Sequence, residues 1–292
     1  MIYEFVRERT DYPAARWLEH LQVSRSGYYE YVDRREAREA ARNARKAEIK
    51  RIFEESRGTY GPDRICGELR SLGKTASYNP VSTMMKEMGL SSIHNKTRTR
   101  SLTDSRKARN DEEMYPNLIR GQTIDKPLRA VCSDITHLPT PEGWEYLCTV
   151  KDIATGCILG HSMGSRMTEE LTANAFLNAH AKHNIGIGTI FHSDRGSQYT
   201  AKGFRSALAM YGVSQSFSRV GYPGDNAWAE SFFAVLKKEC VHLRQFPTRE
   251  ALRAVIFEWI EVFYNNRRIQ KRLGYRSPKE YAAMLTREPH AA

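Results

Sequence analysis

Residues 189–199 read TIFHSDRGSQY, a short apolar run that stops at an acid and continues into a glycine-containing turn. The segment Thr189–His192 predicts a buried strand, and Asp194 follows it directly. Thr200–Tyr211 then has helical apolar spacing, and Ser214–Phe217 predicts another strand. This alternation predicts an α/β arrangement with an acidic side chain at the end of a strand.

Three more strands are expected upstream, where apolar residues stand between turn signals: Ala130–Leu138, Tyr146–Ile153 and Cys157–Met163. Their short connections predict an antiparallel meander, and a helix at Glu169–His183 joins it to the strand at 189–192. The strand that opens a meander usually lies near the centre of a mixed sheet. A fourth strand beside it would bring Asp194 close to Asp134, which lies in the first strand.

A third acid, Glu230, stands in the first turns of a helix expected to begin at Asn226. Three converging carboxylates repel one another unless cations neutralise them. All-oxygen ligand sets suit Mg²⁺ or Mn²⁺ rather than zinc. Two such ions can activate an attacking oxygen and stabilise a leaving one in a phosphodiester displacement. We therefore expect Asp134, Asp194 and Glu230 to be catalytic and to hold two divalent metal ions.

Each acid also has a purely structural explanation. Asp134 could be a hydrogen-bonded acid at a strand end, and Asp194 could form an Asx turn or cap the next helix. Glu230 could be favoured only by the dipole of its helix. The joint placement of the three acids at element ends favours the catalytic interpretation.

The first half of the chain has helical patterns. A helix is expected at Pro13–His20, Ser24 is expected to cap a second short helix, and Arg34–Ser56 predicts a long charged helix. Two short helices should follow, one from Pro62 to Gly73 and one capped by Asn79 and ended by Gly89. Together they predict a helix-turn-helix unit whose helix Pro80–Met88 would read a DNA groove. A module that serves only for packing has the same pattern.

Composition agrees with a polyanionic partner. The chain has 45 Lys and Arg against 34 Asp and Glu, a net charge of +11. Residues 93–110 hold Arg98, Arg100 and four further basic residues against one acid, which predicts a linker that contacts phosphates through Arg98 and Arg100. A plain solvated linker remains the alternative.

Five cysteines without a CxxC pair argue against a disulfide framework or a cysteine-rich zinc site. The chain has no apolar run long enough for a membrane span, and its first residues lack the apolar stretch of a secretory signal. We expect a soluble intracellular protein.

The stretches HSDRGSQY at 192–199, DNA at 225–227 and ESFF at 230–233 resemble the catalytic core of the insertion-sequence-three family of bacterial transposases. In that family 35 residues separate the second Asp from the Glu, and a basic residue follows seven positions later. Here 230 − 194 = 36, which leaves 35 residues between, and 237 − 230 = 7 gives Lys237. The resemblance implies an RNase H-like core with a mixed sheet, related to retroviral integrases, preceded by an all-α helix-turn-helix region.

The resemblance covers nearly the whole chain. It includes Ser24–Tyr29 and the C-terminal pattern Tyr264–Pro278, although Gln270 stands where the family commonly has His. It implies metal-dependent cleavage and strand transfer on double-stranded DNA, at the element's terminal repeats and at a target. It also implies a homo-oligomer in a synaptic complex and fusion to an upstream helix-turn-helix and leucine-zipper protein. Lys237 is a fourth catalytic candidate, and further candidates for contact with DNA are Arg195, Lys237, Lys238 and Arg268.

These observations predict five regions: an N-terminal helical segment 1–44, a helix-turn-helix domain 45–92, a basic linker 93–125, a catalytic domain 126–285 and a tail 286–292. The expected function is that of a DDE transposase. Two alternatives remain open: a non-catalytic, sequence-specific DNA-binding protein derived from a transposase, and a nuclease that cleaves DNA without joining it.

Overall fold

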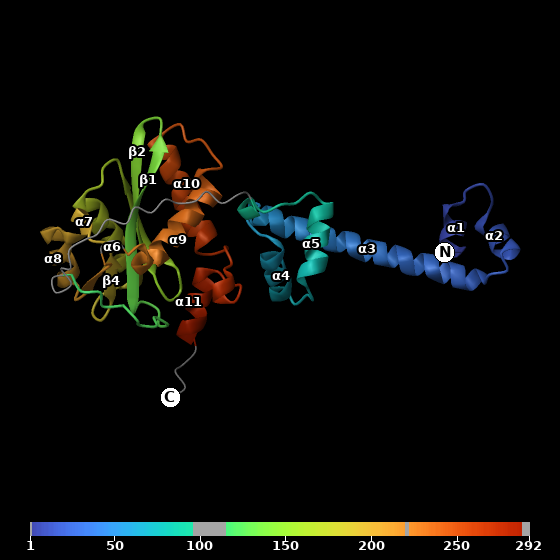
Figure 1. The fold of residues 1–292 in the computed structure, drawn as a ribbon, viewed down its shortest axis with the longest axis horizontal. Helices are drawn as coiled ribbons and strands as arrows, with labels where there is room; N and C mark the ends of the chain where they lie inside the picture. Colours follow the sequence, from blue (N-terminus) through green and yellow to red (C-terminus); the bar gives the residue numbers. More distant parts are fainter. Residues whose placement is uncertain (1, 96–114, 220–221, 288–292) are drawn as a thin grey trace. The chain divides into compact units, whose positions relative to one another are not determined.

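The computed structural model describes residues 2–95, 115–219 and 222–287. The chain forms two compact units, Met1–Ser91 and Ser92–Ala292, each with its own elements (Figure 1). Most of the expected basic linker, including Arg98 and Arg100, lies outside the described residues.

The first unit is helical. Its elements are α1 (Ile2–Glu8), α2 (Ala14–His20), α3 (Arg25–Glu55), α4 (Pro62–Ser71) and α5 (Tyr78–Glu87). The continuous helix α3 corrects the expectation of two separate helices. The junction between them, residues 30–33, has no Gly or Pro to interrupt a helix, and the ion pair of Arg34 with Glu30 spans it. The expected boundary between residues 44 and 45 therefore falls inside one helix.

The helix ends follow the expected chemistry with one exception. The Ser24 side chain accepts a hydrogen bond at the start of α3, and Pro62 stands at the first position of α4. Gly73 and Gly89 have positive φ where α4 and α5 end. Helix α5 begins at Tyr78 rather than after Asn79, because Pro80 is tolerated within a first turn, where its missing N–H has no helical partner.

The first unit has apolar residues buried at both ends of α3. Near its start, Val6, Leu18 and Tyr28 form a cluster that joins α1, α2 and α3. Near its end α3 contacts α4 and α5. The apolar residues buried at this end of the unit include Ile49, Ile52, Ile65, Cys66, Leu69, Val81 and Met85.

The second unit contains a five-stranded mixed sheet (Figure 1). Its strands are β1 (Ala130–Thr140), β2 (Gly143–Asp152), β3 (Ile158–Gly164), β4 (Ile190–Ser193) and β5 (Ser214–Phe217), in the order β3-β2-β1-β4-β5. The first three strands form the expected antiparallel meander, and β4 and β5 add in parallel to β1. The opening strand of the meander is thus central, as predicted.

Helices cover both faces of this sheet. Successive side chains of β2 point to opposite faces of the sheet, and each face has its own hydrophobic core. Val150 packs in the core that contains residues of α6 (Glu169–His183) and α8 (Lys202–Met210), whereas Leu147 packs in the core on the opposite face. This second core contains residues of α9 (Ala227–Leu236) and α10 (Arg249–Glu258).

Several smaller elements complete the unit. A single helix was expected at Thr200–Tyr211, but the chain forms α7 (Ser197–Thr200) and α8, separated by Ala201 in an extended conformation. A π-helical turn at Trp259–Tyr264 leads into the C-terminal pattern, which contains a 3-10 turn at Lys271–Leu273 and is followed by α11 (Pro278–Arg287).

All five cysteines are buried and unbridged. In the part of the chain that the structure describes, no helix is both long and apolar enough to cross a membrane.

Candidate active site

Asp134 and Asp194 lie near each other because β1 and β4, the strands that lead to them, are parallel neighbours in the sheet. Cys132 of β1 pairs with His192 of β4, and each aspartate stands two residues further along its strand direction. Asp134 is therefore inside β1, while Asp194 follows the end of β4. The predicted approach of these two residues results from this register.

Asp134 is in an environment that disfavours its charge. Burial is the largest cause, a hydrogen bond from the Ile135 N–H acts in the opposite direction, and the charges of Asp194 and Glu230 raise the pKa of Asp134 further, to about 7. Since both acids affect the same carboxyl, all three carboxylates share one electrostatic site. Lys237 also acts there, and its charge lowers the pKa of Asp134.

The other two acids are exposed. Asp194 Oδ1 accepts a hydrogen bond from the Gly196 N–H at 3.0 Å, so the Asx turn considered as a structural alternative is present. That bond uses one of several lone pairs on the carboxylate. Glu230 stands in the first turn of α9, where its side chain is exposed. Both side chains have carboxylate oxygen atoms available for another ligand.

The donor set fits a hard divalent cation, because it consists only of carboxylate oxygens. Within the described residues, no three His, Cys, Asp or Glu side chains already form a group that could hold a metal ion. Three carboxylates without a neutralising cation repel one another, and the two exposed side chains can rotate inward when a cation is present. The residues therefore have the right chemistry, although the ligand shell is not preformed.

Lys237 lies beside this site at a change of helix type. Helix α9 ends at Leu236, and Lys237 begins a π-helical turn that extends to Val241. The Lys237 N–H still bonds to the Phe233 carbonyl, so the seven residues from Glu230 to Lys237 make about two helical turns. Burial lowers the pKa of Lys237, and the charge of Asp134 raises it. The ammonium group thus interacts electrostatically with the central carboxylate.

The remaining basic candidates make contacts within the chain. Arg195 Nε donates to the Ser218 carbonyl at 3.2 Å, and its guanidinium lies 5.3 Å from the Tyr115 ring centroid. Lys238 Nζ donates to the His94 carbonyl at 3.2 Å.

The structure contradicts the predicted contact of Arg268 with DNA, because this residue is only 3% exposed. Its guanidinium donates two hydrogen bonds to Glu239, at 2.8 and 2.6 Å, and His94 Nε2 lies 2.7 Å from the same carboxylate. The expectation that Arg268 contacts DNA is wrong, since the guanidinium is buried in an ion pair. Its conspicuous place in the C-terminal pattern marks a packing role.

His192 stands in β4, two residues before Asp194. It is fully buried and its ring nitrogens are hydrogen-bonded inside the protein, which excludes direct contact with DNA. Burial lowers the pKa of His192 to about 4, whereas the Asp225 carbonyl raises it, so the ring is neutral near pH 7.

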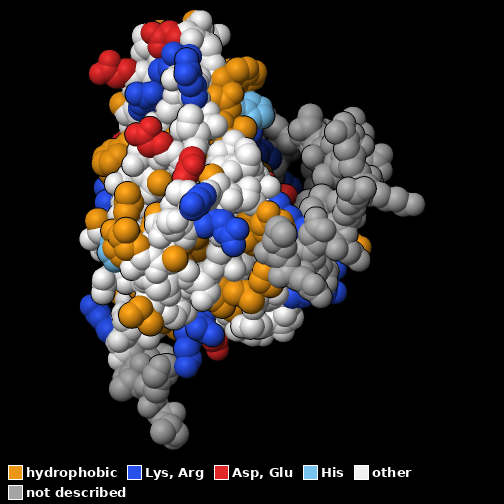
Figure 2. All heavy atoms as spheres, turned by 90° about the vertical axis from the view of Figure 1, so that its left-hand side faces the viewer, with side chains coloured by type: hydrophobic (Ala, Val, Ile, Leu, Met, Phe, Trp, Pro, Cys, Tyr) orange, Lys and Arg blue, Asp and Glu red, His pale blue; other side chains and the backbone are white. Residues whose placement is uncertain are grey.

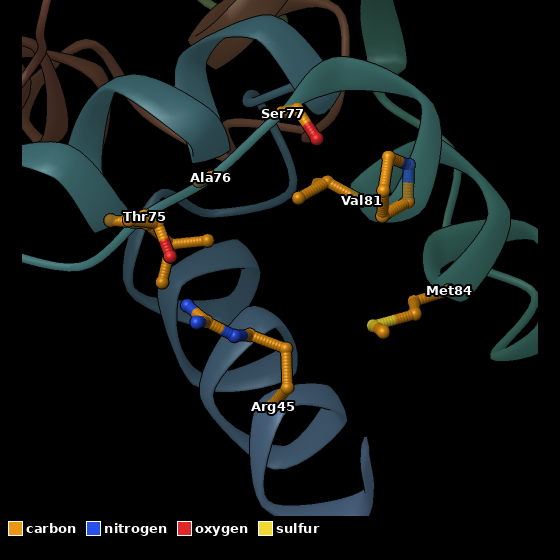
Figure 3. A pocket seen from close by; sticks show the side chains of 8 residues that line it. Arg45, Thr75, Ala76, Ser77, Val81 and Met84 are labelled. Carbon is orange, nitrogen blue, oxygen red and sulfur yellow. The ribbon is translucent and has the colours of Figure 1, made fainter. Parts of the chain in front are cut away.

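Helix α5 in the first unit presents polar side chains at its surface. Tyr78, Asn79, Thr83 and Lys86 of α5 are exposed, in agreement with a groove-reading helix. A pocket of about 330 Å³ lies beside α5, and Arg45 of α3 points into it (Figure 3). Arg45 Nη1 is 3.6 Å from Glu48, so the charge of this pocket is partly neutralised.

Comparison with known proteins supports the same organisation. Family models described as "Integrase core domain" match residues 125–223 and 230–285, and one described as "HTH-like domain" matches 39–98. An insertion element IS600 protein of 31 kDa from Shigella sonnei is 37% identical over 262 residues, covering 89% of this chain and 94% of that protein. Transposase InsF of insertion sequence IS3A from Escherichia coli (strain K12) is 32% identical over 265 residues, covering 89% and 91%. The HTLV-2 integrase catalytic core, solved in complex with magnesium, aligns with 54% of this chain and 97% of that chain, at 16% identity and a TM-score of 0.41.

The mixed sheet, the two integrase-core matches and the helix-turn-helix-like match define a polynucleotidyl transferase with an RNase H-like core. Within that class, the chain belongs to the IS3 family of insertion-sequence transposases.

Proposed function

We propose that this transposase cleaves and joins DNA with Asp134, Asp194 and Glu230 as its catalytic metal ligands. The observation that carries the proposal is the parallel register of β1 and β4, which places Asp134 and Asp194 side by side, and the charges of Asp194 and Glu230, which both raise the pKa of Asp134, agree with it. When bound, two Mg²⁺ or Mn²⁺ ions would supply activation of the attacking oxygen and stabilisation of the leaving oxygen. Asp134 would hold the ions from the central strand, together with Asp194 and Glu230.

The substrate side of the proposal is double-stranded DNA, from the element's terminal repeats and from a target. The exposed residues of α5 would contact the repeat, and Lys237 would hold a phosphate beside the three acids. Arg195 has guanidinium nitrogens beyond the one bound to Ser218, so it remains a candidate for a second phosphate contact. Arg98 and Arg100 remain candidates from the sequence alone.

Lys237→Gln is expected to weaken DNA binding at low salt and to lower the slope of log affinity against log salt by about one, because one phosphate contact is lost. The measurement is fluorescence anisotropy with a labelled duplex at several salt concentrations. Lys202→Gln is the matched control, since Lys202 is an exposed lysine on α8 of the same unit. An unchanged slope for Lys237→Gln would exclude the phosphate contact.

We also propose that the active form is a homo-oligomer, fused to an upstream helix-turn-helix and leucine-zipper partner. The test of function is a strand-transfer assay with a labelled duplex that carries the element's end, with Mg²⁺, with and without that partner. Joined products are expected. DNA binding without cleavage or joining, even with the partner, would support the non-catalytic alternative, and cleavage without joining would support a nuclease.

A further inference from the structure

The segment that leads into α9 is bound to both strands that carry the aspartates. His192 of β4 bonds to the main chain of Asp225, and Asn226 bonds to the main chain of Ser133 in β1. The two bonds thus hold two consecutive residues, Asp225 and Asn226, which lie directly before Ala227, where α9 begins. Glu230 lies four residues after Asn226, about one helical turn.

We propose that His192, Asp225 and Asn226, here called the α9 anchor, position Glu230 relative to Asp134 and Asp194. This inference rests on the proposed catalytic role of the three acids. The members of the anchor are positioning residues, since they act through α9 and through the strands.

The His192 half of the anchor has three hydrogen-bond partners. Nε2 lies 2.9 Å from the Asp225 carbonyl oxygen, which can only accept, and 3.0 Å from the Ser218 hydroxyl, which can also accept, so the hydrogen is assigned to Nε2. Nδ1 lies 2.9 Å from Ser216 Oγ, and that hydroxyl accepts from the Leu118 N–H at 2.9 Å, which leaves its own hydrogen for Nδ1. The ring is 0% exposed, so water does not compete for these bonds.

The Asp225 side chain restrains the same turn from the other side. Its carboxylate accepts from Arg219 through the backbone N–H and Nε, both at 3.0 Å, and through Nη2 at 3.1 Å. Asn117 Nδ2 is a further donor at 3.2 Å. The Asp225 peptide is therefore restrained both by its carbonyl and by its side chain.

The Asn226 half of the anchor links α9 to the central strand. Asn226 Nδ2 donates to the Ser133 carbonyl at 3.3 Å, one residue before Asp134, and the side chain is buried. Asn226 occupies the N-cap position of α9 but makes no side-chain capping bond. Its side chain therefore connects the helix to β1 instead of stabilising the helix end. A substitution of Asn226 consequently tests this connection without removing a helix cap.

A matched pair of substitutions separates positioning from packing. The amide of Gln at position 192 reaches about as far as Nε2 and can donate to Asp225, whereas the amide of Asn reaches only as far as Nδ1. His192→Asn is expected to raise the Mn²⁺ concentration for half-saturation, measured by electron paramagnetic resonance of free Mn²⁺, by about tenfold or more, because a displacement of about 1 Å from a supporting residue has large effects. His192→Gln is expected to stay within about twofold of wild type, with a similar melting temperature.

Hydrogen exchange without metal gives a second readout that does not depend on the acids. The peptide that spans α9 is expected to exchange faster in His192→Asn than in His192→Gln. Asn226→Leu should show the same two changes and carries the test if the His192 variants do not fold. Asn178→Leu is its control, because Asn178 also donates to a carbonyl, that of His161, on another part of the sheet.

Equal Mn²⁺ half-saturation and equal exchange in His192→Asn, Asn226→Leu and wild type would overturn the anchor. Asp194→Asn in the same titration keeps the two proposals distinguishable. If Asp194→Asn binds Mn²⁺ like wild type, the metal site fails, whereas a wild-type result for the anchor variants with loss of binding in Asp194→Asn would reject the anchor alone.

Discussion

Asp194→Asn and Glu230→Gln are each expected to lower the rate of strand transfer by at least about a thousandfold, equivalent to about 4 kcal/mol of transition-state stabilisation. This is the expected result because an amide keeps the shape of the carboxylate but removes the negative charge that binds a divalent cation. The measurement is the rate of joined-product formation with saturating DNA and Mg²⁺, beside the wild-type protein.

The structure predicts that both variants fold normally. In Asp194→Asn the amide oxygen can still accept the bond from the Gly196 N–H. Glu230 is exposed in the first turn of α9, where losing its charge removes only a small favourable interaction with the helix dipole. Melting temperature and DNA affinity should therefore stay close to wild type, which isolates the chemical step.

The chain offers a control for each variant. Glu170→Gln removes an exposed glutamate from the first turn of α6, so it reproduces the dipole effect without the site. Asp125→Asn removes an exposed aspartate from the same unit. Both should keep wild-type strand transfer. Full activity in Glu230→Gln would show that Glu230 is not a catalytic ligand. The spacing between Asp194 and Glu230 would then have no catalytic explanation.

The sheet could be predicted from local sequence because each strand of the meander is bounded by turn residues and because apolar residues mark β4 and its neighbours. Asp194 follows β4 as expected, and the meander places Asp134 on the central strand. The break expected within α3 was wrong, because capping signals such as Ser24 mark where a helix begins but do not show where a neighbouring helical segment ends.

The parts that could not be predicted depend on long-range packing. Arg268 had the charge and position of a DNA contact, but only the fold shows that it is buried against Glu239, 268 − 239 = 29 residues earlier. His192 and Asn226 stood within recognised motifs, yet their links to Asp225 and Ser133 require the sheet to be assembled first. On the face drawn in Figure 2, apolar side chains lie in several separate groups among basic and other polar ones.

The buried ion pair of Glu239 and Arg268 leads to the second large effect. Glu239→Gln is expected to lower the free energy of unfolding by about 3–5 kcal/mol, because it leaves a buried guanidinium without its counter-charge. Both side chains are almost fully buried, with 0% of Glu239 and 4% of Arg268 exposed. Urea unfolding followed by circular dichroism measures the change. Lys182→Gln is the control, since its ion pair with Glu261 is half exposed and should contribute less than about 1 kcal/mol.

The double variant Glu239→Gln/Arg268→Met tests the cause, because it removes both buried charges. It should recover much of the stability lost in Glu239→Gln. No recovery would mean that the lost bond to His94 or altered packing, rather than an uncompensated charge, causes the effect.

The same pair predicts a dependence on pH. Burial raises the pKa of Glu239, but the hydrogen bonds from Arg268 and His94 outweigh burial and lower it to about 2, from an ordinary value of 4.5. Because the folded-state pKa lies below the unfolded one, this stability is present above about pH 4.5 and is lost as the pH falls towards 2. The difference in unfolding free energy between wild type and Glu239→Gln should therefore shrink over that range. A difference that stays constant down to pH 2 would show that the Glu239 charge does not stabilise the fold, and that its side chain acts through shape alone.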